Sequence, residues 1–413
     1  MNLSFYIARR LSFSSSGRRS SPAVKVAAIA VGLSVAVMIA SLAIVGGFKR
    51  EIVNKIIGLN AHITLMVSND DGGGDNLVNL NPSLKRILDS QPYITAYWLE
   101  AAIPAVLKTP DNFKGVYLKG FGHRADNAFL QHGLAAGELP DYAVSDNHLK
   151  AVITSTIANE LHLKPGDTVE TYFLSDDVRL RKLTVGAITD SHFESYDKLY
   201  IYGDLGLVAD LGGFPDSKGT MMRILTEDFD STPRYAAELN SLFAKEYANG
   251  RIDKLYHVDT TLERGEIYFS WLRLLDTNVI VILVLMSIVA CVTLISGMLI
   301  IILDKVSLIG ILKAMGAPGA TIRRIFIWLA LKVCLIGLGA GNVIMIVLLW
   351  IQERTHLLRL DPEAYYIDFV PVRIDWLEVG ILNVAVLLLI WLALILPSHI
   401  ISTISPATTI RYE

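Results

Sequence analysis

Two stretches of the sequence carry side chains that could bind a metal ion, one with acidic residues alone and one with a histidine and acidic residues. The run NDDGGGDN at residues 69–76 offers carboxylate oxygens of the kind that Ca²⁺ prefers. It departs from the EF-hand pattern, however, and its glycines favour a solvated turn. In SHFESYD, residues 191–197, His192 and Glu194 stand two positions apart, where a surface turn is a better interpretation than a zinc site. We therefore expect no metal site in this chain.

Residues for covalent or nucleotide chemistry show no recognisable arrangement either. The nine histidines form no H-E-x-x-H motif, and no serine lies in a G-x-S-x-G elbow. No sequence motif therefore supports a hydrolase function. The phosphate-binding pattern G-x-x-x-x-G-K-[ST] is absent from the sequence, so the chain does not split ATP with that machinery. We expect no catalytic residue and no cofactor bound by this chain.

Four apolar segments are long enough to cross a membrane. The chain of 413 residues is 52% hydrophobic and only 19% charged, with a mean hydropathy of +0.45. A span needs roughly 20 apolar residues, and residues 26–48, 277–303, 325–352 and 379–397 qualify. Their one charged residue, Lys332, is near enough to a helix end to reach the headgroups. The weaker alternative is a soluble core whose four buried helices are apolar on every face.

The lysines and arginines beside these spans predict their orientation. Basic residues crowd segment 1–25, which has no acidic residue, and dominate the 304–324 loop, whereas acidic residues outnumber basic ones in 353–378. The N-terminal segment, the 304–324 loop and the C-terminal tail 398–413 are therefore expected in the cytoplasm. Residues 49–276 and the short 353–378 loop are expected outside. We interpret SFYIARRLSF, near the start, as a basic amphipathic helix on the inner leaflet, with a disordered leader as the alternative.

Residues 49–276 read as a mixed α+β domain carried on two helical stalks. Strand-like runs alternate with helix-like runs such as 232–248, for which Thr232 is the expected N-cap. The first stalk continues span one and is expected to stop near Gly58. On the returning stalk, one face is predicted to pack against the first: Ile267, Trp271, Leu274 and Leu275. Both cysteines, Cys291 and Cys334, fall inside spans, so the domain has no disulfide.

The 308–324 stretch, LIGILKAMGAPGATIRR, has more structure than a connection between two spans needs. An apolar face recurs in it at helical spacing, made of Leu308, Ile311, Leu312 and Met315. Such a face must be buried against a groove on another protein or against the chain's own spans, and the pattern alone leaves both open.

The remainder of this stretch reads as a helix stop followed by an anchor. Gly310 would permit a close approach, and Lys313 could reach an acidic partner. Gly316 stands where a helix C-cap is expected, and Pro318 prevents continuation of the helix. The arginine pair 323–324 would then hold the third span at the inner headgroups.

Together these features resemble the MacB/FtsX-like permease family, the membrane subunits of the mechanotransmission class of ABC transporters. Within that family the chain most resembles the Lol-type lipoprotein-releasing permeases, nearly end to end. Three stretches carry the resemblance: GGFKREIVNKIIGLNAHITL at 46–65, LIGILKAMGAPGATIRRIF at 308–326 and RLDPEAYYIDFVPVRIDWLEV at 359–379. The last favours the Lol type over MacB.

The resemblance implies a dimer, with a second copy or a related subunit, acting on two copies of a cytoplasmic ABC ATPase that binds ATP and Mg. A lipoprotein substrate would be lifted from the outer leaflet of the bacterial inner membrane and passed to a periplasmic carrier, with no part for nucleic acid. The resemblance also assigns one run to ATPase coupling: Leu308, Ile309, Gly310, Ile311, Leu312, Lys313, Ala314, Met315 and Gly316.

The sequence departs from the family pattern in two places. Ser307 and Leu308 stand where the family often has an Arg-Glu pair, so a more apolar ATPase contact is expected. FLSDDVRLRK, residues 173–182, is a short counterpart of the family's carrier-binding hairpin. Direct capture of a carrier by this chain is therefore left open.

A lipid-anchored substrate would need an apolar lateral cleft at the outer leaflet. Candidate walls are Val37, Ile39, Leu42, Ile44, Phe48 and Ile52, with Val279 and Leu283 opposite. For each of these positions, lipid contact or helix packing is the alternative. Two small-xxx-small pairs, Gly32 with Ala36 and Gly337 with Gly341, are interpreted as helix-packing sites.

Two other functions fit the same family. One is an FtsX-like regulator that passes ATPase strokes to a periplasmic cell-wall hydrolase, although such regulators usually have a smaller external domain. The other is a MacB-like efflux permease. A stand-alone membrane enzyme would lack a catalytic constellation. The fold expected in every case is four transmembrane helices with a large α+β periplasmic domain between spans 1 and 2.

Overall fold

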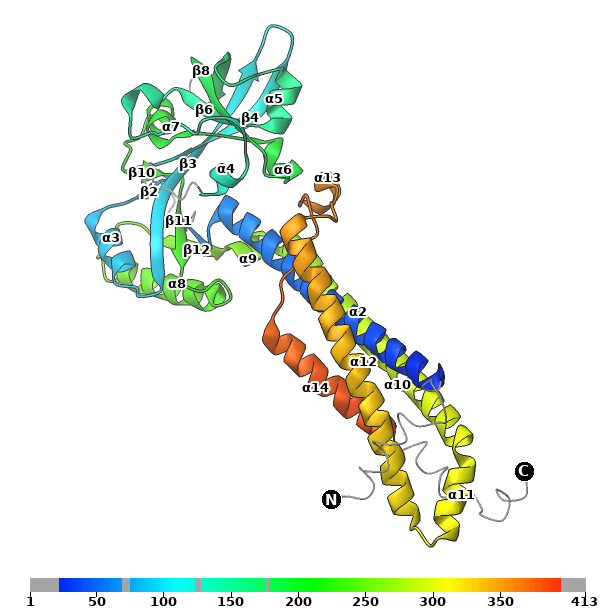
Figure 1. Cartoon of the computed structure of the whole chain (residues 1–413). Helices are drawn as coiled ribbons and strands as arrows, with labels where there is room; N and C mark the ends of the chain where they lie inside the picture. The colour runs from blue at the N-terminus through cyan, green and yellow to red at the C-terminus, as the bar shows by residue number, and fades with distance from the viewer. Residues whose placement is uncertain (1–21, 69–74, 123–127, 175–177, 395–413) are drawn as a thin grey trace. The chain divides into compact units, whose positions relative to one another are not determined.

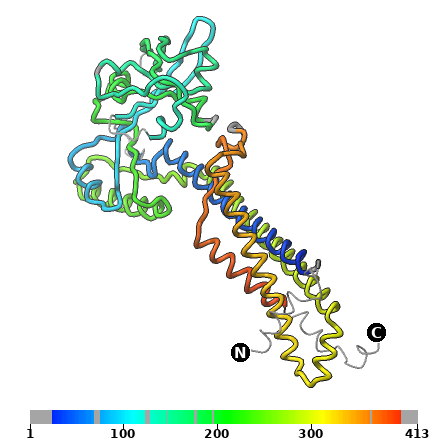
Figure 2. The backbone as a smooth tube through the Cα atoms, in the orientation of Figure 1, coloured from blue at the N-terminus to red at the C-terminus, as the bar shows by residue number. Residues whose placement is uncertain are grey.

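The computed structural model describes residues 22–68, 75–122, 128–174 and 178–394, which divide into two units. The helical unit comprises the chain up to Arg50, Trp271–Arg359 and the chain from Phe369 onward. The sheet unit comprises Glu51–Ser270 and Leu360–Asp368. Figure 2 traces both along the backbone. The predicted N-terminal amphipathic helix and the tail 398–413 lie outside the described residues.

Among its described residues, the helical unit has five helices: α2 (Pro22–Asn60), α10 (Glu266–Asp304), α11 (Val306–Ala314), α12 (Gly319–Thr355) and α14 (Trp376–Ala393). All except α11 are long and apolar enough to cross a membrane, which confirms four candidate spans in the described part of the chain. Figure 1 shows these four lying alongside one another. The Asp375 carboxylate caps the start of α14 by accepting the backbone N–H groups of Leu377 and Glu378.

Helix α2 is the central helix of this unit. In its most apolar 18-residue stretch 44% of the residues are buried, whereas the share is 17–22% in the other three spans. Its inward stripe has residues at i, i+4, i+7 and i+8, all with no exposed surface: Val31, Val35, Met38 and Ile39. These side chains pack in one apolar cluster with residues of α10, α12 and α14.

Twelve strands occur among the described residues of the sheet unit. Their bounds are β1 (Ile63–Val67), β2 (Val78–Asn79), β3 (Ile94–Lys108), β4 (Phe113–Phe121), β5 (Leu134–Gly137), β6 (Lys150–Thr154), β7 (Thr168–Leu174), β8 (Val178–Thr189), β9 (Tyr200–Asp204), β10 (Lys218–Gly219), β11 (Met221–Thr226) and β12 (Tyr256–Thr260). Strands β2 and β10 pair with each other, and the other ten form one sheet.

The strand β3 is shared by two lobes of that sheet (Figure 1). In one lobe, β3, β4, β9, β6, β8 and β7 pair in a closed ring, because β7 joins β8 back to β3. Side chains alternate along each strand, and the inward set fills the core, with Leu107, Leu118, Phe173 and Leu183 fully buried. In the other lobe, the order β12–β1–β11–β3 is antiparallel throughout.

Short helices complete the sheet unit. They are α3 (Pro82–Asp89), α4 (Ala128–His132), α5 (Ser155–Leu161), α6 (Glu194–Asp197), α7 (Leu205–Gly212), α8 (Thr232–Ala248), α9 (Thr261–Arg264) and α13 (Pro362–Tyr365). Leu84 of α3 and Phe243 of α8 are fully buried in the same core as the strands. The mixed α+β composition expected from the sequence is confirmed.

Two local expectations differ from the structure. The N-cap position of helix α8 is Ser231, not Thr232, and its side chain makes no capping hydrogen bond. Helix α2 runs past Gly58 to Asn60, and the left-handed backbone of Ala61 (φ 56°) ends it. Gly58 instead allows a close approach, because a Cβ there would lie 3.0 Å from Phe129 of α4.

The returning stalk also buries a different face from the one predicted. Ile267 and Leu274 are exposed at the start of α10, whereas Phe269 and Leu272 are buried. The two stalk helices contact each other through the rings of Phe48 and Trp271, whose centroids lie 5.6 Å apart. Beside this contact, Lys49 Nζ lies 2.7 Å from Asp276 Oδ2.

Candidate functional site

The short helix α11 and the turn after it occupy the 304–324 loop. The helix ends in a Schellman motif, in which Ala317 N–H donates to the Leu312 carbonyl at 2.9 Å and Gly316 N–H to the Lys313 carbonyl at 3.0 Å. Gly316 takes the left-handed conformation (φ 87°) that this motif requires, and Pro318 then precedes the first residue of α12. The helix end was predicted correctly from the sequence, because a glycine followed by a proline is a strong local signal for the end of a helix.

The inward and outward faces of α11 differ from the predicted stripe. Ile309 is fully buried in the core of the helical unit and Gly310 is buried beside it. Leu312 packs partly against the same core. The outward face consists of Ile311, which is 51% exposed, and Met315, 79% exposed, with Ala314 and Gly316 also exposed. Leu308 and Lys313 are half-buried.

Packing on the chain's own helices, one of the two alternatives, is observed for part of α11. Ile309 and Gly310 are buried there and Leu312 packs partly there, so the exposed surface of α11 lies at other residues. The reason is angular: at 100° per residue, Ile309 points away from Ile311. The apolar surface that α11 offers is centred on Ile311 and Met315.

Glycines set the contact between α2 and α12. A Cβ on Gly341 would lie 2.3 Å from the Gly32 carbonyl oxygen, and one on Gly337 would lie 2.5 Å from the Ala28 carbonyl oxygen. Real side chains do not approach backbone atoms so closely, so any larger residue would force the two helices apart. Ala36, the fourth predicted packing residue, is also buried.

The predicted substrate-cleft residues do not share one open surface. Four are buried within the chain, namely Ile39, Phe48, Ile52 and Val279. The other four are half-buried, namely Val37, Leu42, Ile44 and Leu283. The broad exposed apolar surface of α10 lies on another side, at Ile280, Val281, Val284, Leu285, Ile288, Val289 and Val292. Sequence reasoning missed this row because in an apolar span every face looks alike.

The acidic glycine loop is described only from Asp75 onward, and residues 69–74 lie outside the described part. Asp75 accepts hydrogen bonds from Lys218, at 2.6 Å, and from Lys254. These bonds hold the pKa of Asp75 below its usual value. Among the described residues, no group of three or more histidine, cysteine, aspartate or glutamate side chains could hold a metal ion.

His192 fastens the 360–368 segment to the rest of the sheet unit. Its Nδ1 lies 2.9 Å from Asp190 Oδ1 and its Nε2 lies 3.2 Å from Asp368 Oδ2. The bond to Asp190, together with the charges of Asp190 and Asp368, raises the pKa of His192. The Phe193 ring stacks on Tyr366 with centroids 4.8 Å apart. This turn is thus an attachment point for the 360–368 segment.

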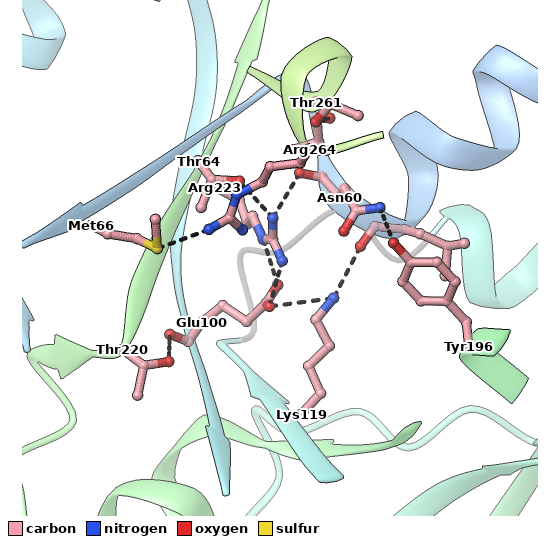
Figure 3. A network of polar contacts seen from close by, with 12 residues as sticks. Asn60, Thr64, Met66, Glu100, Lys119, Tyr196, Thr220, Arg223, Thr261 and Arg264 are labelled. Atoms are coloured by element: carbon pink, nitrogen blue, oxygen red, sulfur yellow. Dashed lines mark hydrogen bonds and ion pairs between the residues drawn. The ribbon is translucent and has the colours of Figure 1, made fainter. Parts of the chain in front are cut away.

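A buried charge cluster lies at the end of α2 within the sheet unit (Figure 3). Glu100 of β3, Lys119 of β4 and Arg223 of β11 are each less than 10% exposed. Arg223 donates from Nε and Nη2 to the two Glu100 carboxylate oxygens, both at 3.0 Å. Lys119 Nζ lies 3.3 Å from Glu100 Oε1. Sequence reasoning did not single out this cluster, because its members are more than 100 residues apart at the extremes and follow no motif.

The electrostatics of the cluster follow from burial and from pairing. Burial lowers the pKa of Lys119 to about 8, although the Glu100 carboxylate partly offsets the shift. Burial would raise the pKa of Glu100, but the charges of Arg223 and Lys119 outweigh that effect and leave it lowered. Glu100 is therefore ionised at neutral pH and holds two cations in place.

Two family models match this chain. The model of the MacB-like periplasmic core domain matches residues 26–242, more than half of the 413 residues. The model of the FtsX-like permease C-terminal region matches residues 280–406. The chain belongs to the MacB/FtsX permease family. Its four spanning helices make this permease a multi-pass membrane protein.

Named relatives of this permease extend over nearly its whole length. It is 26% identical to the lipoprotein-releasing system transmembrane protein LolE of Haemophilus influenzae, over 98% of this chain and 99% of that protein. It is 23% identical to LolC of Neisseria meningitidis serogroup B, over 94% of each chain. The crystal structure of the periplasmic region of MacB from Actinobacillus actinomycetemcomitans matches 53% of this permease and 97% of that chain, with 16% identity and a TM-score of 0.36.

Proposed function

We propose that this permease is the membrane subunit of an ABC transporter that releases lipoproteins from the outer leaflet of the bacterial inner membrane. The observation that carries the proposal is the similarity to lipoprotein-releasing transmembrane proteins over more than nine-tenths of both chains. Similarity of that extent includes the spans, the sheet unit and the 359–379 segment. It is not confined to one widely shared domain.

The power source in this proposal is a separate cytoplasmic ATPase, which binds ATP and Mg. The apolar face of α11, centred on Ile311 and Met315, supplies a surface for that ATPase. Burying two such side chains contributes roughly 1.5–3 kcal/mol each. The basic residues around this loop favour its cytoplasmic side, which supports a periplasmic position for the sheet unit. Two permease subunits, identical or related, would enclose the substrate.

The sheet unit would receive the mechanical stroke and pass the lipoprotein to a periplasmic carrier. We assign no residue of this chain to carrier capture, because residues 175–177, which connect β7 to β8, lie outside the described part of the chain. Helices α2 and α10 are each far longer than the roughly 20 residues that a bilayer needs. Their length supports transmission of a movement out of the membrane rather than transport through a channel between the spans.

Depletion of the permease in its own bacterium tests the function. Lipoproteins normally found in the outer membrane should accumulate in the inner membrane, as measured by membrane fractionation and immunoblotting. An unchanged distribution would contradict the proposal. Affinity purification under ATP-trapping conditions should recover an ABC ATPase together with a lipoprotein. Recovery of a cell-wall hydrolase, or of an efflux adaptor and duct, would favour the FtsX-like or the MacB-like function instead.

A further inference from the structure

The C-terminal end of α2 is held by side chains from three other elements of the sheet unit. A helix leaves its last carbonyl groups without intrahelical partners. Here the Leu59 carbonyl accepts from Lys119 Nζ at 3.0 Å, and the Asn60 carbonyl accepts from Arg223 Nη1 at 3.1 Å. The next carbonyl, of Ala61, accepts from Thr261 Oγ1 at 2.7 Å. Successive carbonyls are thus bound to β4, β11 and α9 (Figure 3).

Glu100 keeps the two cations aimed at these carbonyls. Its carboxylate takes both the guanidinium of Arg223 and the ammonium of Lys119. Arg223 also donates to Thr64 Oγ1 at 2.7 Å, which ties the same group to β1. We call Glu100, Lys119 and Arg223 the clasp. Its net positive charge faces the negative end of the α2 macrodipole, where cations are favourable.

Stability alone does not account for the clasp. Replacing buried ion pairs with apolar residues of similar volume often leaves a protein as stable or makes it more stable. An apolar cluster could fill this place, but it could not bind backbone carbonyls. The clasp therefore does one thing that packing cannot do, which is to bind the last turn of α2 to strands that are not its neighbours in sequence.

Without the clasp, the last turn of α2 would still be joined to the sheet unit by Ala61, whose left-handed backbone (φ 56°) separates the helix from β1, and by two other bonds. These run from Thr261 of α9 to the Ala61 carbonyl and from Asn60 Nδ2 to Tyr196 of α6, so neither reaches β3, β4 or β11. A single residue between a helix and a strand can rotate and absorb a displacement. With the clasp, displacement of the last turn acts directly on β3, β4 and β11. Since β3 belongs to both lobes, both receive the force.

We propose that Glu100, Lys119 and Arg223 are positioning residues that transmit movement of α2 to the sheet. The proposal rests on the proposed function, because it supplies the step between ATPase stroke and lipoprotein release. These residues touch neither substrate nor nucleotide. They act through the carbonyls of Leu59 and Asn60.

The main test removes all three charges together, so that no unpaired charge is left buried. The full complex of permease, ATPase and a lipoprotein is reconstituted in phospholipid vesicles, with Glu100→Gln, Lys119→Met and Arg223→Met combined in the permease. We expect a thermal midpoint near that of the wild type, ATP hydrolysis within about two-fold, and release per ATP hydrolysed reduced at least ten-fold. Release per ATP equal to that of the wild type would overturn the proposal.

A matched control uses an ion pair in the same unit that does not contact α2. Lys114 Nζ lies 2.6 Å from Glu160 Oε2. The variant Lys114→Met/Glu160→Gln should keep wild-type release per ATP. If this control lost release to the same extent as the clasp variant, the effect would be general and the proposal wrong.

Two single variants separate transmission from folding. Lys119→Met removes the donor to the Leu59 carbonyl, whereas Lys119→Arg keeps a donor and a charge there. We expect Lys119→Met to lower release per ATP and Lys119→Arg to restore most of it. A purely structural role would make release follow the thermal midpoint of each variant instead.

Hydrogen exchange in the wild-type complex makes the test independent of transport. Trapping the ATPase with nucleotide should change exchange at β3 amides in the wild type and leave them unchanged in the triple variant. If the wild type releases no lipoprotein yet shows this change in exchange, the proposed function is wrong, but the proposal that the clasp transmits movement of α2 to the sheet still stands. Nucleotide-dependent exchange at β3 in both proteins would overturn the transmission.

Discussion

At the residue scale, the most informative groups are those whose charges are buried and fully partnered. Glu100 is 4% exposed and balances two cations that are themselves buried. Removing one member of such a group leaves the others unpaired in a medium of low dielectric constant, which costs more than the group contributed. A single substitution here is therefore expected to destabilise the protein more than the combined substitution of all three residues.

The first prediction concerns Glu100 alone. Glu100→Gln should lower the free energy of unfolding by about 3–5 kcal/mol, because Arg223 and Lys119 lose their shared counter-charge. The measurement is the thermal midpoint of the full-length protein in detergent. Glu160→Gln, which breaks a partly exposed pair, should cost below about 1 kcal/mol. Equal effects of the two substitutions would contradict the burial argument.

The second prediction concerns Asp197. Burial raises its pKa to about 6, although Ser191 donates to it from Oγ at 2.8 Å. Because the folded pKa exceeds the unfolded value of about 3.9, the unfolded state loses its proton first as pH rises. The free energy of unfolding should therefore fall by roughly 2–3 kcal/mol between about pH 4 and pH 6, at 1.36 kcal/mol per pKa unit.

Asp197→Asn removes this titration and serves as the comparison. We expect the wild type to lose stability relative to the variant across that pH interval, as measured by hydrogen exchange at β6 and β9 amides. Above pH 7 and below pH 3 the difference should become constant. A difference that rises with pH would show that the sign is wrong.

At the element scale, helix α2 makes two kinds of contact through its backbone, one with α12 and one with the sheet. Along the helical unit it meets α12 through bare backbone at Gly32, Gly337 and Gly341. At its last turn it meets strands through charged side chains. Both contacts are made to the backbone of the helix, by close approach at the glycines and by hydrogen bonds at the last carbonyls.

The third prediction tests the glycine contact. Gly341→Ala should destabilise the helical unit, because its Cβ would lie 2.3 Å from the Gly32 carbonyl oxygen. Gly339→Ala is the matched control, since nothing lies within 4 Å of a Cβ there. Alanine is about 1 kcal/mol better than glycine inside a helix. The thermal midpoint in detergent should therefore fall for Gly341→Ala and stay level or rise for Gly339→Ala.

The fourth prediction tests the surface of α11. Ile311→Glu and Met315→Glu should each weaken copurification of the ATPase by at least ten-fold while the permease stays folded, because an exposed apolar anchor becomes charged. Ile309→Glu should instead unfold the helical unit, because Ile309 is fully buried. If Ile311→Glu and Met315→Glu bind the ATPase normally, that surface is not the contact.

At the scale of the whole molecule, the sequence predicts the elements better than it predicts their faces. Four spans and the α11 stop follow from long apolar runs and from Gly316 with Pro318, which are local signals. The buried side of α11 and the exposed side of α10 do not, because a span that is apolar all round has no marked face.

The functional cluster is the clearest case of information that lies outside any local pattern. Glu100, Lys119 and Arg223 look like solvated charges in the sequence, and such residues are almost never fully buried unless paired. Only the pairing of β3 with β4 and β11 brings them together. Tertiary context, not residue type, creates that site.

The position of β1 sets a limit on how this permease can be made. Its partners are β11 and β12, so Ile63 pairs with Thr260, nearly 200 residues later. At about 5–20 residues per second, the ribosome needs roughly 10–40 seconds to supply that partner. Until β11 has been synthesised β1 has both edges unpaired, and one edge then stays open until β12 follows; open strand edges promote aggregation. The cell must therefore shield a nascent strand that already trails from an inserted helix, and slowing synthesis between residues 68 and 256 should make misassembly worse.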